Sequence, residues 1–172
     1  MVRRVAFGKA VVAGAAGAVA WEAVARLGVW AGVPLFDIVR ALGTLVSGSG
    51  AAWWQWWVAG IAMHVIVGVV WATFYAYFFW SSFDSPPFLQ GMFFTLLPII
   101  LAGLIMIPQM DLMLADDLSS GFRHSFGIFA HGLGWLGPVS VILGHLIYGA
   151  VMGAIYIRPV GYAVERHKVR FG

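Results

Sequence analysis

Four long apolar stretches, separated by segments that hold most of the charged residues, dominate this sequence. A helix needs about 20 predominantly apolar residues to cross the hydrocarbon core of a bilayer. The stretches that meet this requirement are residues 7–30, 54–80, 88–107 and 138–157. Since backbone groups in hydrocarbon must be satisfied within their own segment, the pattern predicts an all-α integral membrane protein with four transmembrane helices. Pro98 predicts a kink or local break in the third helix.

Two connecting segments carry amphipathic patterns of their own. Residues 35–42 place Asp37 and Arg40 on one side of a short helix, and residues 122–133 allow a second one. Helices of this kind lie in the plane of the membrane interface. We therefore expect short interfacial helices in the two outer loops.

One motif occurs twice, with identical spacing, in the second and fourth apolar stretches. Its copies are His64-x3-Gly68-x3-Ala72-x2-Tyr75 and His145-x3-Gly149-x3-Gly153-x2-Tyr156. A Pro-x-φ-Asp pattern (φ, an apolar residue) also occurs twice, at residues 34–41 and 108–115, each time ahead of a histidine stretch. The shared order predicts two tandem hairpins, at about 7–80 and 88–157, related by a pseudo-twofold axis along the membrane normal. The alternative is coincidence in an apolar sequence rich in Gly and Ala.

The histidine stretches resemble those of small, uncharacterised bacterial four-span membrane proteins, which often read like Gly144-His145-x3-Gly149-x3-Gly153-x2-Tyr156. The resemblance covers mainly the second and fourth stretches. It implies no activity and no functional residues.

Composition and charge agree with membrane insertion. The chain is 62% hydrophobic and only 10% charged, whereas a soluble domain carries about 25% charged residues. It contains no cysteine, which excludes disulfides, iron–sulfur clusters and thiolate zinc sites.

Most of the basic residues lie near the two ends of the chain: Arg3, Arg4, Lys9, Arg158, Arg166, Lys168 and Arg170. The positive-inside rule then predicts that both termini are cytoplasmic. We expect residues 1–172 to form one membrane domain of a bacterial inner membrane, with residues 158–172 as a basic cytoplasmic tail. There is no basic stripe with interleaved aromatic residues, so we expect no nucleic-acid partner.

The two motif histidines are the main candidate functional residues, because ionisable groups are costly in a bilayer. Positions i, i+4 and i+8 share one helix face, and small residues on that face let helices approach closely. Two stripes of this kind are predicted for helix packing. Gly68 and Ala72 follow His64 on one face, and Gly149 and Gly153 follow His145 in the same way. In this interpretation each histidine bonds to a neighbouring helix.

Two other interpretations give the histidines a ligand. His64 and His145 could be the axial ligands of one b-type haem, or could each bind a chlorophyll-type pigment. Alternatively Glu22, which has an i, i+4 partner in Arg26, could face both histidines and bind a transition metal or pass a proton. The first interpretation predicts a haem or pigment protein and the second a small metal or proton transporter.

Catalytic motifs are missing from the sequence, which contains no Gly-x-Ser-x-Gly, no His-Glu-x2-His and no phosphate-binding glycine loop. We therefore expect a non-enzymatic protein. The preferred prediction is a small accessory or assembly subunit that packs in a larger or homo-oligomeric membrane complex. Its expected partners are the lipid bilayer and other membrane subunits.

Overall fold

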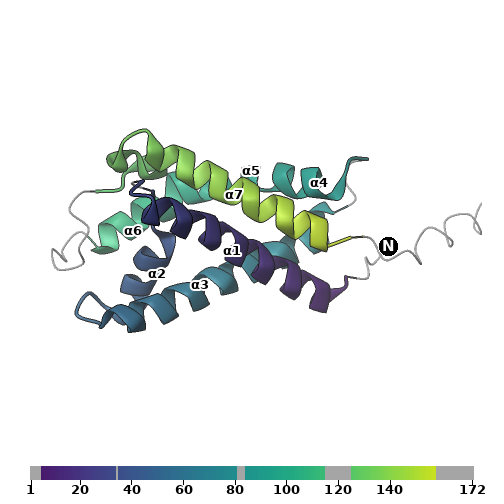
Figure 1. Cartoon of the computed structure of the whole chain (residues 1–172). Coiled ribbons are helices and arrows are strands. Elements are labelled where there is room, and N and C mark those ends of the chain that lie inside the picture. Colours follow the sequence, from purple (N-terminus) through teal and green to yellow (C-terminus); the bar gives the residue numbers. More distant parts are fainter. Residues whose placement is uncertain (1–4, 34, 81–83, 115–124, 158–172) are drawn as a thin grey trace, which may run out of the picture.

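The computed structural model describes residues 5–33, 35–80, 84–114 and 125–157, and within these ranges it is helical and has no strands (Figure 1). Four helical stretches are long and apolar enough to cross a membrane, as predicted. They are α1 (Phe7–Trp30), Trp53–Phe79, Pro87–Leu114 and α7 (Leu136–Ile155). The second consists of α3 (Trp53–Phe74) and a π-helical turn, Tyr75–Phe79.

The third stretch is longer and less regular than predicted. It consists of α4 (Pro87–Phe94), α5 (Leu96–Leu101), a π-helical turn at Ala102–Met106 and α6 (Ile107–Leu114). The prediction ended this helix at residue 107, before Pro108. Pro108 is the second residue of α6, which directly follows the π-helical turn, where the regular pattern of hydrogen bonds four residues apart is already interrupted.

A break interrupts the third stretch where Pro98 predicts one. Pro98 has no N–H to donate to the carbonyl of Phe94, four residues earlier. The regular helix stops at Phe94 and resumes at Leu96. Between them, the hydroxyl of Thr95 donates a hydrogen bond of 2.7 Å to the carbonyl of Met92. The predicted interruption of this helix is confirmed.

The first connecting segment forms a helix, α2 (Ile38–Ser47), which belongs to the core of the bundle. Asp37 is its N-cap and accepts a hydrogen bond of 2.9 Å from the backbone N–H of Arg40. A side chain at Gly43 would collide with the backbone of Trp56, so α2 and α3 approach closely. More than half of α2 is buried, which is more than an interfacial helix requires.

The second connecting segment does not form the predicted α-helix. Residues 115–124 lie outside the described ranges, and Ile128–Leu133 forms only short 3₁₀ turns. Phe129 and Ala130 have φ values of 54° and 58°, which a right-handed helix cannot contain. Asp111 holds the preceding turn by accepting hydrogen bonds from the backbone N–H groups of Phe126 and Gly127.

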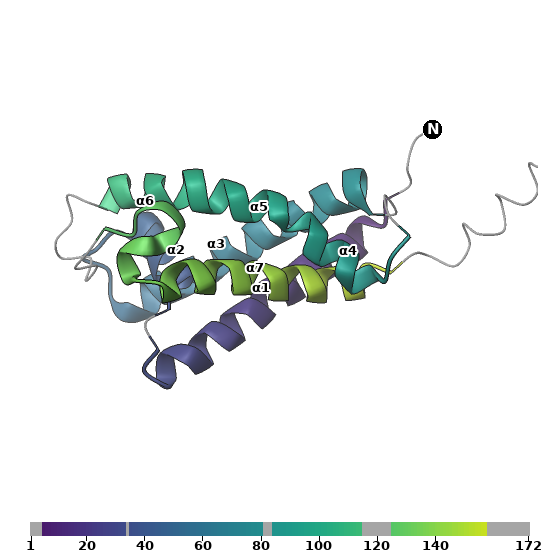
Figure 2. The same cartoon turned by 90° about the horizontal axis from the view of Figure 1, so that it is seen from above.

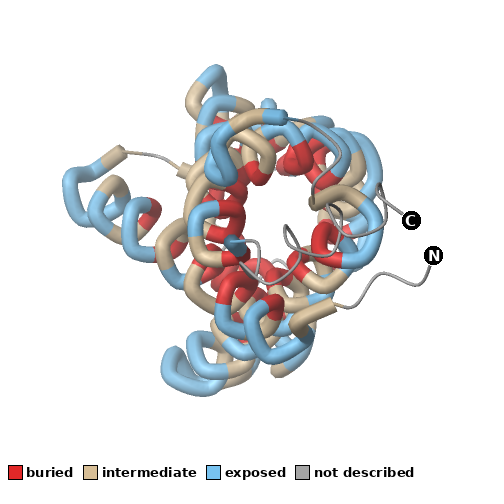
Figure 3. Tube along the Cα trace, turned by 90° about the vertical axis from the view of Figure 1, so that its right-hand side faces the viewer, coloured by how far each residue is buried: buried red, intermediate tan, exposed pale blue. Residues whose placement is uncertain are grey.

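In the packing of the bundle, α1 lies between two neighbouring helices. α1 packs against α3 and α7, α4 packs against α7, and α2 packs against α3 (Figures 1 and 2). α1 begins and α7 ends at the same end of the bundle (Figure 1), where the ammonium group of Lys9 donates to the carbonyl of Ile157. Buried residues line the inner faces of the helices, and the outer faces are exposed (Figure 3).

Candidate functional site

The small residues of the first motif copy form a seam with α1. A Cβ atom on Gly14 of α1 would lie 2.6 Å from the carbonyl oxygen of Gly68 and 2.8 Å from the Cβ of Ala72. A Cβ on Gly68 would lie 3.1 Å from the Cβ of Ala18. Only glycine permits this approach, so Gly68 and Ala72 pack helices within the chain.

The second motif copy uses its small residues in the same way, against α4. A Cβ on Gly149 would lie 2.5 Å from the carbonyl oxygen of Gly91 and 2.6 Å from Cγ2 of Thr95. Gly153 faces the same helix, because a Cβ there would lie 3.0 Å from the Cα of Gly91. In each copy the small stripe thus packs on the long helical stretch that precedes it in the sequence.

The two motif histidines are buried and meet the same side chain, Trp21 of α1. The indole centroid lies 4.9 Å from the His64 ring, edge to face, and 4.5 Å from the His145 ring. Gly144 provides the necessary space, since a Cβ there would lie 2.7 Å from Cδ2 of Trp21. The histidines therefore come close to each other with an indole packed against both.

Little space is left beside these rings. The cavity that both histidines line has a volume of about 60 Å³ and almost entirely apolar walls. Small-molecule sites usually have volumes of about 300–1,000 Å³. His145 also uses one ring nitrogen internally, because its Nδ1 lies 2.8 Å from the carbonyl oxygen of Val141 on its own helix. This geometry favours the packing interpretation over a haem held between His64 and His145. The predicted hydrogen bond to a neighbouring helix is wrong for His145, because its ring bonds to its own helix, α7.

Tyr148 is a further link between the motif helices. Its hydroxyl donates a hydrogen bond of 2.6 Å to the carbonyl of Gly68, joining α7 to α3. Its ring lies against Gly17, where a Cβ would be 2.7 Å from Cδ2 of the tyrosine. Three helices thus meet at this one side chain.

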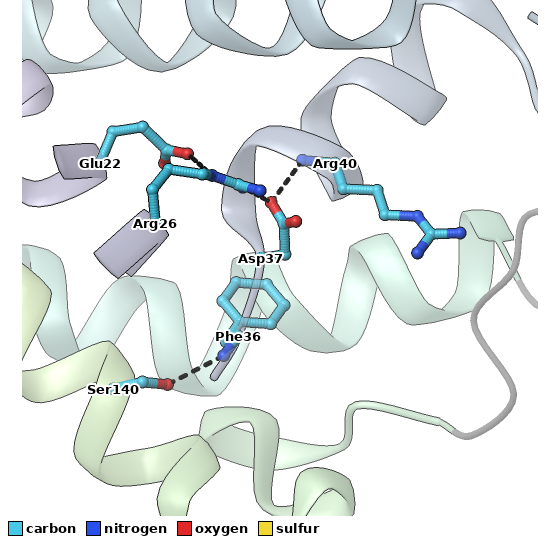
Figure 4. Close-up of polar contacts among 6 residues, drawn as sticks. All are labelled: Glu22, Arg26, Phe36, Asp37, Arg40 and Ser140. Atoms are coloured by element: carbon cyan, nitrogen blue, oxygen red, sulfur yellow. Dashed lines mark hydrogen bonds and ion pairs between the residues drawn. The ribbon is translucent and has the colours of Figure 1, made fainter. Parts of the chain in front are cut away.

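A chain of charged groups runs from α1 to the start of α2 (Figure 4). Arg26 donates from Nε to Glu22 and from Nη2 to Asp37, which itself caps α2. The predicted Glu22–Arg26 pair is confirmed, and Asp37 extends it. Nearby, the hydroxyl of Ser140 on α7 accepts a hydrogen bond from the backbone N–H of Phe36.

The predicted metal group of Glu22, His64 and His145 does not come together as a cluster of ligands. Within the described ranges, no three His, Asp or Glu side chains lie close enough together to hold a metal ion. Glu22 and His64 instead line one groove, and His64 and His145 line the separate small cavity. The part of the chain that the structure describes therefore offers no three-ligand metal site.

The groove beside Glu22 is much larger than the cavity that both histidines line. It has a volume of about 590 Å³ and lies between the second half of α1 and the first half of α3. Its walls include the rings of four tryptophans, Trp30, Trp53, Trp56 and Trp57. Its polar lining comes from Glu22, Arg26 and His64.

No family model, curated protein or solved structure matches this chain.

Sequence reasoning missed Trp21, Tyr148 and the tryptophan groove. One signal was present for the first of these residues, because Trp21 precedes the candidate residue Glu22 and directly follows a run of Ala, Gly and Val residues. Periodicity does not indicate which way it faces, since α1 is apolar on nearly all sides. The groove depends on how α1 and α3 diverge, which no local pattern encodes.

Proposed function

We propose that this chain is an integral membrane protein of a bacterial inner membrane, with both termini in the cytoplasm. Four apolar helices of sufficient length support insertion. Their outer faces expose large apolar side chains such as Val12, Leu27 and Val70, each about 60% exposed, which suit a hydrocarbon environment. The basic residues near both chain ends support the orientation.

Single cysteines test this orientation, because the natural chain has none. A membrane-impermeant maleimide added to intact cells should label a Ser49→Cys variant, in the turn before α3. It should label an Asp84→Cys variant, in the turn before α4, only after the cells are permeabilised. The reverse pattern would overturn the proposed orientation.

We also propose that the chain consists of two tandem hairpins. The equivalent use of both small-residue stripes supports this, with Gly68 and Ala72 on α1 and with Gly149 and Gly153 on α4. The Pro-x-φ-Asp segments do not add support, because Asp37 caps a helix from outside and Asp111 lies within α6. A duplication would therefore be better preserved in the packing seams than in the outer segments.

The function that we propose is that of a small, non-enzymatic accessory or assembly subunit in a larger or homo-oligomeric membrane complex. The filled interior carries this proposal. Trp21 packs against both histidines, and the cavity beside them measures only about 60 Å³. A bundle without an internal site for a large cofactor offers its outer faces to other molecules, and multi-pass subunits use such faces for assembly.

The second span has the largest outer face for such contacts. Only 22% of its most apolar 18-residue segment is buried inside the protein, against 39% of the corresponding segment in each of the other spans. Along α3, side chains at every fourth position point outward, among them Trp54, Val58, Ile66 and Val70. This stripe is the surface on which we expect a partner subunit or a second copy of the chain.

A photo-crosslinking amino acid at Ile66 tests the proposal in native membranes. The expected result is a crosslinked product of discrete mass, either a dimer or a complex with one other protein. The matched control is the same group at Leu97, an exposed position on the third span. If Ile66 gives only lipid adducts and the protein purifies as a monomer, the accessory proposal is wrong.

A further inference from the structure

The groove between α1 and α3 is bordered by the carboxylate of Glu22, one of whose oxygens lacks a hydrogen-bond donor. Glu22 is only 7% exposed, and Arg26 bonds to its Oε1. The other oxygen, Oε2, is buried and has no partner within the described part of the chain. An unsatisfied buried carboxylate oxygen is costly, so a donor is expected at this position.

Among the residues that the structure describes, no neighbouring side chain supplies that donor. Arg26 is shared between Glu22 and Asp37. Figure 4 shows the guanidinium of Arg40 directed away from Glu22, and it lies 6.0 Å from the centre of the Trp56 ring. Glu22 itself lines the groove. Because the last side-chain torsion of glutamate has broad minima, a small rotation turns the buried Oε2 towards a bound ligand.

The walls of the groove are suited to a cation with an apolar body. Trp56 already accepts one guanidinium over its ring, and Trp30, Trp53 and Trp57 present further aromatic surface. Aromatic faces attract cations, most strongly where water is excluded. At about 590 Å³ the groove lies within the usual range for small-molecule sites.

We propose that the groove binds an amphiphilic compound with a protonated primary amine, whose ammonium group donates to Glu22 and whose aliphatic chain lies along the tryptophan walls. A primary ammonium fits better than a quaternary one, because only the former has N–H groups for Oε2. Val19 and Leu27 line the groove and are 56% and 62% exposed, so the ligand can enter sideways from the lipid.

The depth of Glu22 favours a free amine over the headgroup of a lipid. Glu22 lies eight residues before the end of α1 at Trp30, which corresponds to roughly 12 Å along the helix axis. A lipid ammonium group would have to leave the headgroup layer to reach this depth. A single-chain amine can enter with its charged end first and keep its apolar chain in the groove.

Octylamine is the probe for a direct test with the full chain in phosphatidylcholine nanodiscs. Calorimetric titration should give saturable binding to the protein, with empty nanodiscs subtracted. We expect octanol and octyltrimethylammonium to bind about tenfold more weakly, because neither replaces the charged N–H donor. Equal binding of octanol and octylamine would overturn the proposal. Loss of octylamine binding in phosphatidylethanolamine nanodiscs would overturn the assignment to a free amine and indicate a lipid headgroup.

Two sets of variants locate the site. Glu22→Gln keeps the size of the side chain and should reduce octylamine affinity to the level of octanol. Trp57→Ala removes a wall of the groove and should also weaken binding, whereas Trp54→Ala, a neighbour on α3 that does not line the groove, should not. Unchanged affinity in both Glu22→Gln and Trp57→Ala would refute the site. If Glu22→Gln fails to fold, the comparison of Trp57→Ala with Trp54→Ala decides, and equal affinities of these two variants would refute the site.

Discussion

The rings of Tyr75 and Tyr156, which end the two motif copies, lie 6.0 Å apart and nearly perpendicular to each other. At the other end of the motif, His64 and His145 both pack on Trp21. The two copies therefore run in the same direction, and equivalent positions lie at the same level of the bundle. The motif marks two helices that lie on either side of α1 and are linked to each other by long side chains.

The seam between α4 and α7 predicts a strong effect of a single methyl group. In Gly91→Ala the new Cβ would overlap the carbonyl of Gly149 and lie 3.0 Å from the Cα of Gly153. Overpacking of this kind costs about 1–3 kcal/mol, so the variant should unfold at a lower temperature in mild detergent. The matched control is Gly8→Ala on α1, where no atom lies within 4 Å. Equal stability of the two variants would show that the seam is looser than described.

The hydroxyl of Tyr148 should contribute measurably to stability. Tyr148→Phe removes the 2.6 Å hydrogen bond to the carbonyl of Gly68 and leaves the ring in place. Hydrogen bonds between membrane helices contribute about 0.6–1.7 kcal/mol, and we expect a loss of that size in thermal unfolding. Tyr77→Phe, at a half-exposed position, serves as the control and should have no effect. A Tyr148→Phe protein as stable as the control would argue against this link.

The visible spectrum tests the haem interpretation directly. We expect protein purified from haem-replete cells to show no Soret band, either oxidised or dithionite-reduced, because Trp21 packs against both histidine rings. The neighbouring cavity of about 60 Å³ is too small for a porphyrin. A Soret band that disappears in His64→Ala and His145→Ala would contradict this expectation and make both residues haem ligands.

Replacing Arg26 should destabilise the protein more than the loss of one ion pair would, because Arg26 pairs with two carboxylates. In Arg26→Met, Glu22 and Asp37 lose their shared cation in a mostly buried setting. Breaking one side of a buried ion pair costs about 3–5 kcal/mol, so unfolding should occur at a markedly lower temperature.

The control for Arg26 removes the acidic charges as well. A triple variant with Glu22→Gln, Arg26→Met and Asp37→Asn should recover most of the lost stability, because no unpaired charge remains. Asparagine at position 37 can still cap α2. If the single and triple variants are equally unstable, the effect comes from lost packing of the arginine stem and not from unpaired charge.

The length and apolar character of the four long helices could be predicted from the sequence alone. Runs of about 20 apolar residues are rare in soluble chains, so α1 and α7 could be located to within about two residues. The break near Pro98 and the Glu22–Arg26 pair could also be predicted, because each depends only on residues within one or two helical turns. Helix packing by Gly149 and Gly153 was predictable from their spacing, but the helix they face was not.

Only the tertiary structure decided which residues meet. The four long helical stretches are apolar on nearly all sides, so periodicity does not determine the rotation of a helix about its axis. The close contacts at Gly14 and Gly91 set that rotation and bring His64 and His145 to Trp21. The groove beside Glu22 arises in the same way, from the angle between two helices that contact each other closely at one end. The sequence by itself therefore determined the elements, and packing between them determined the site.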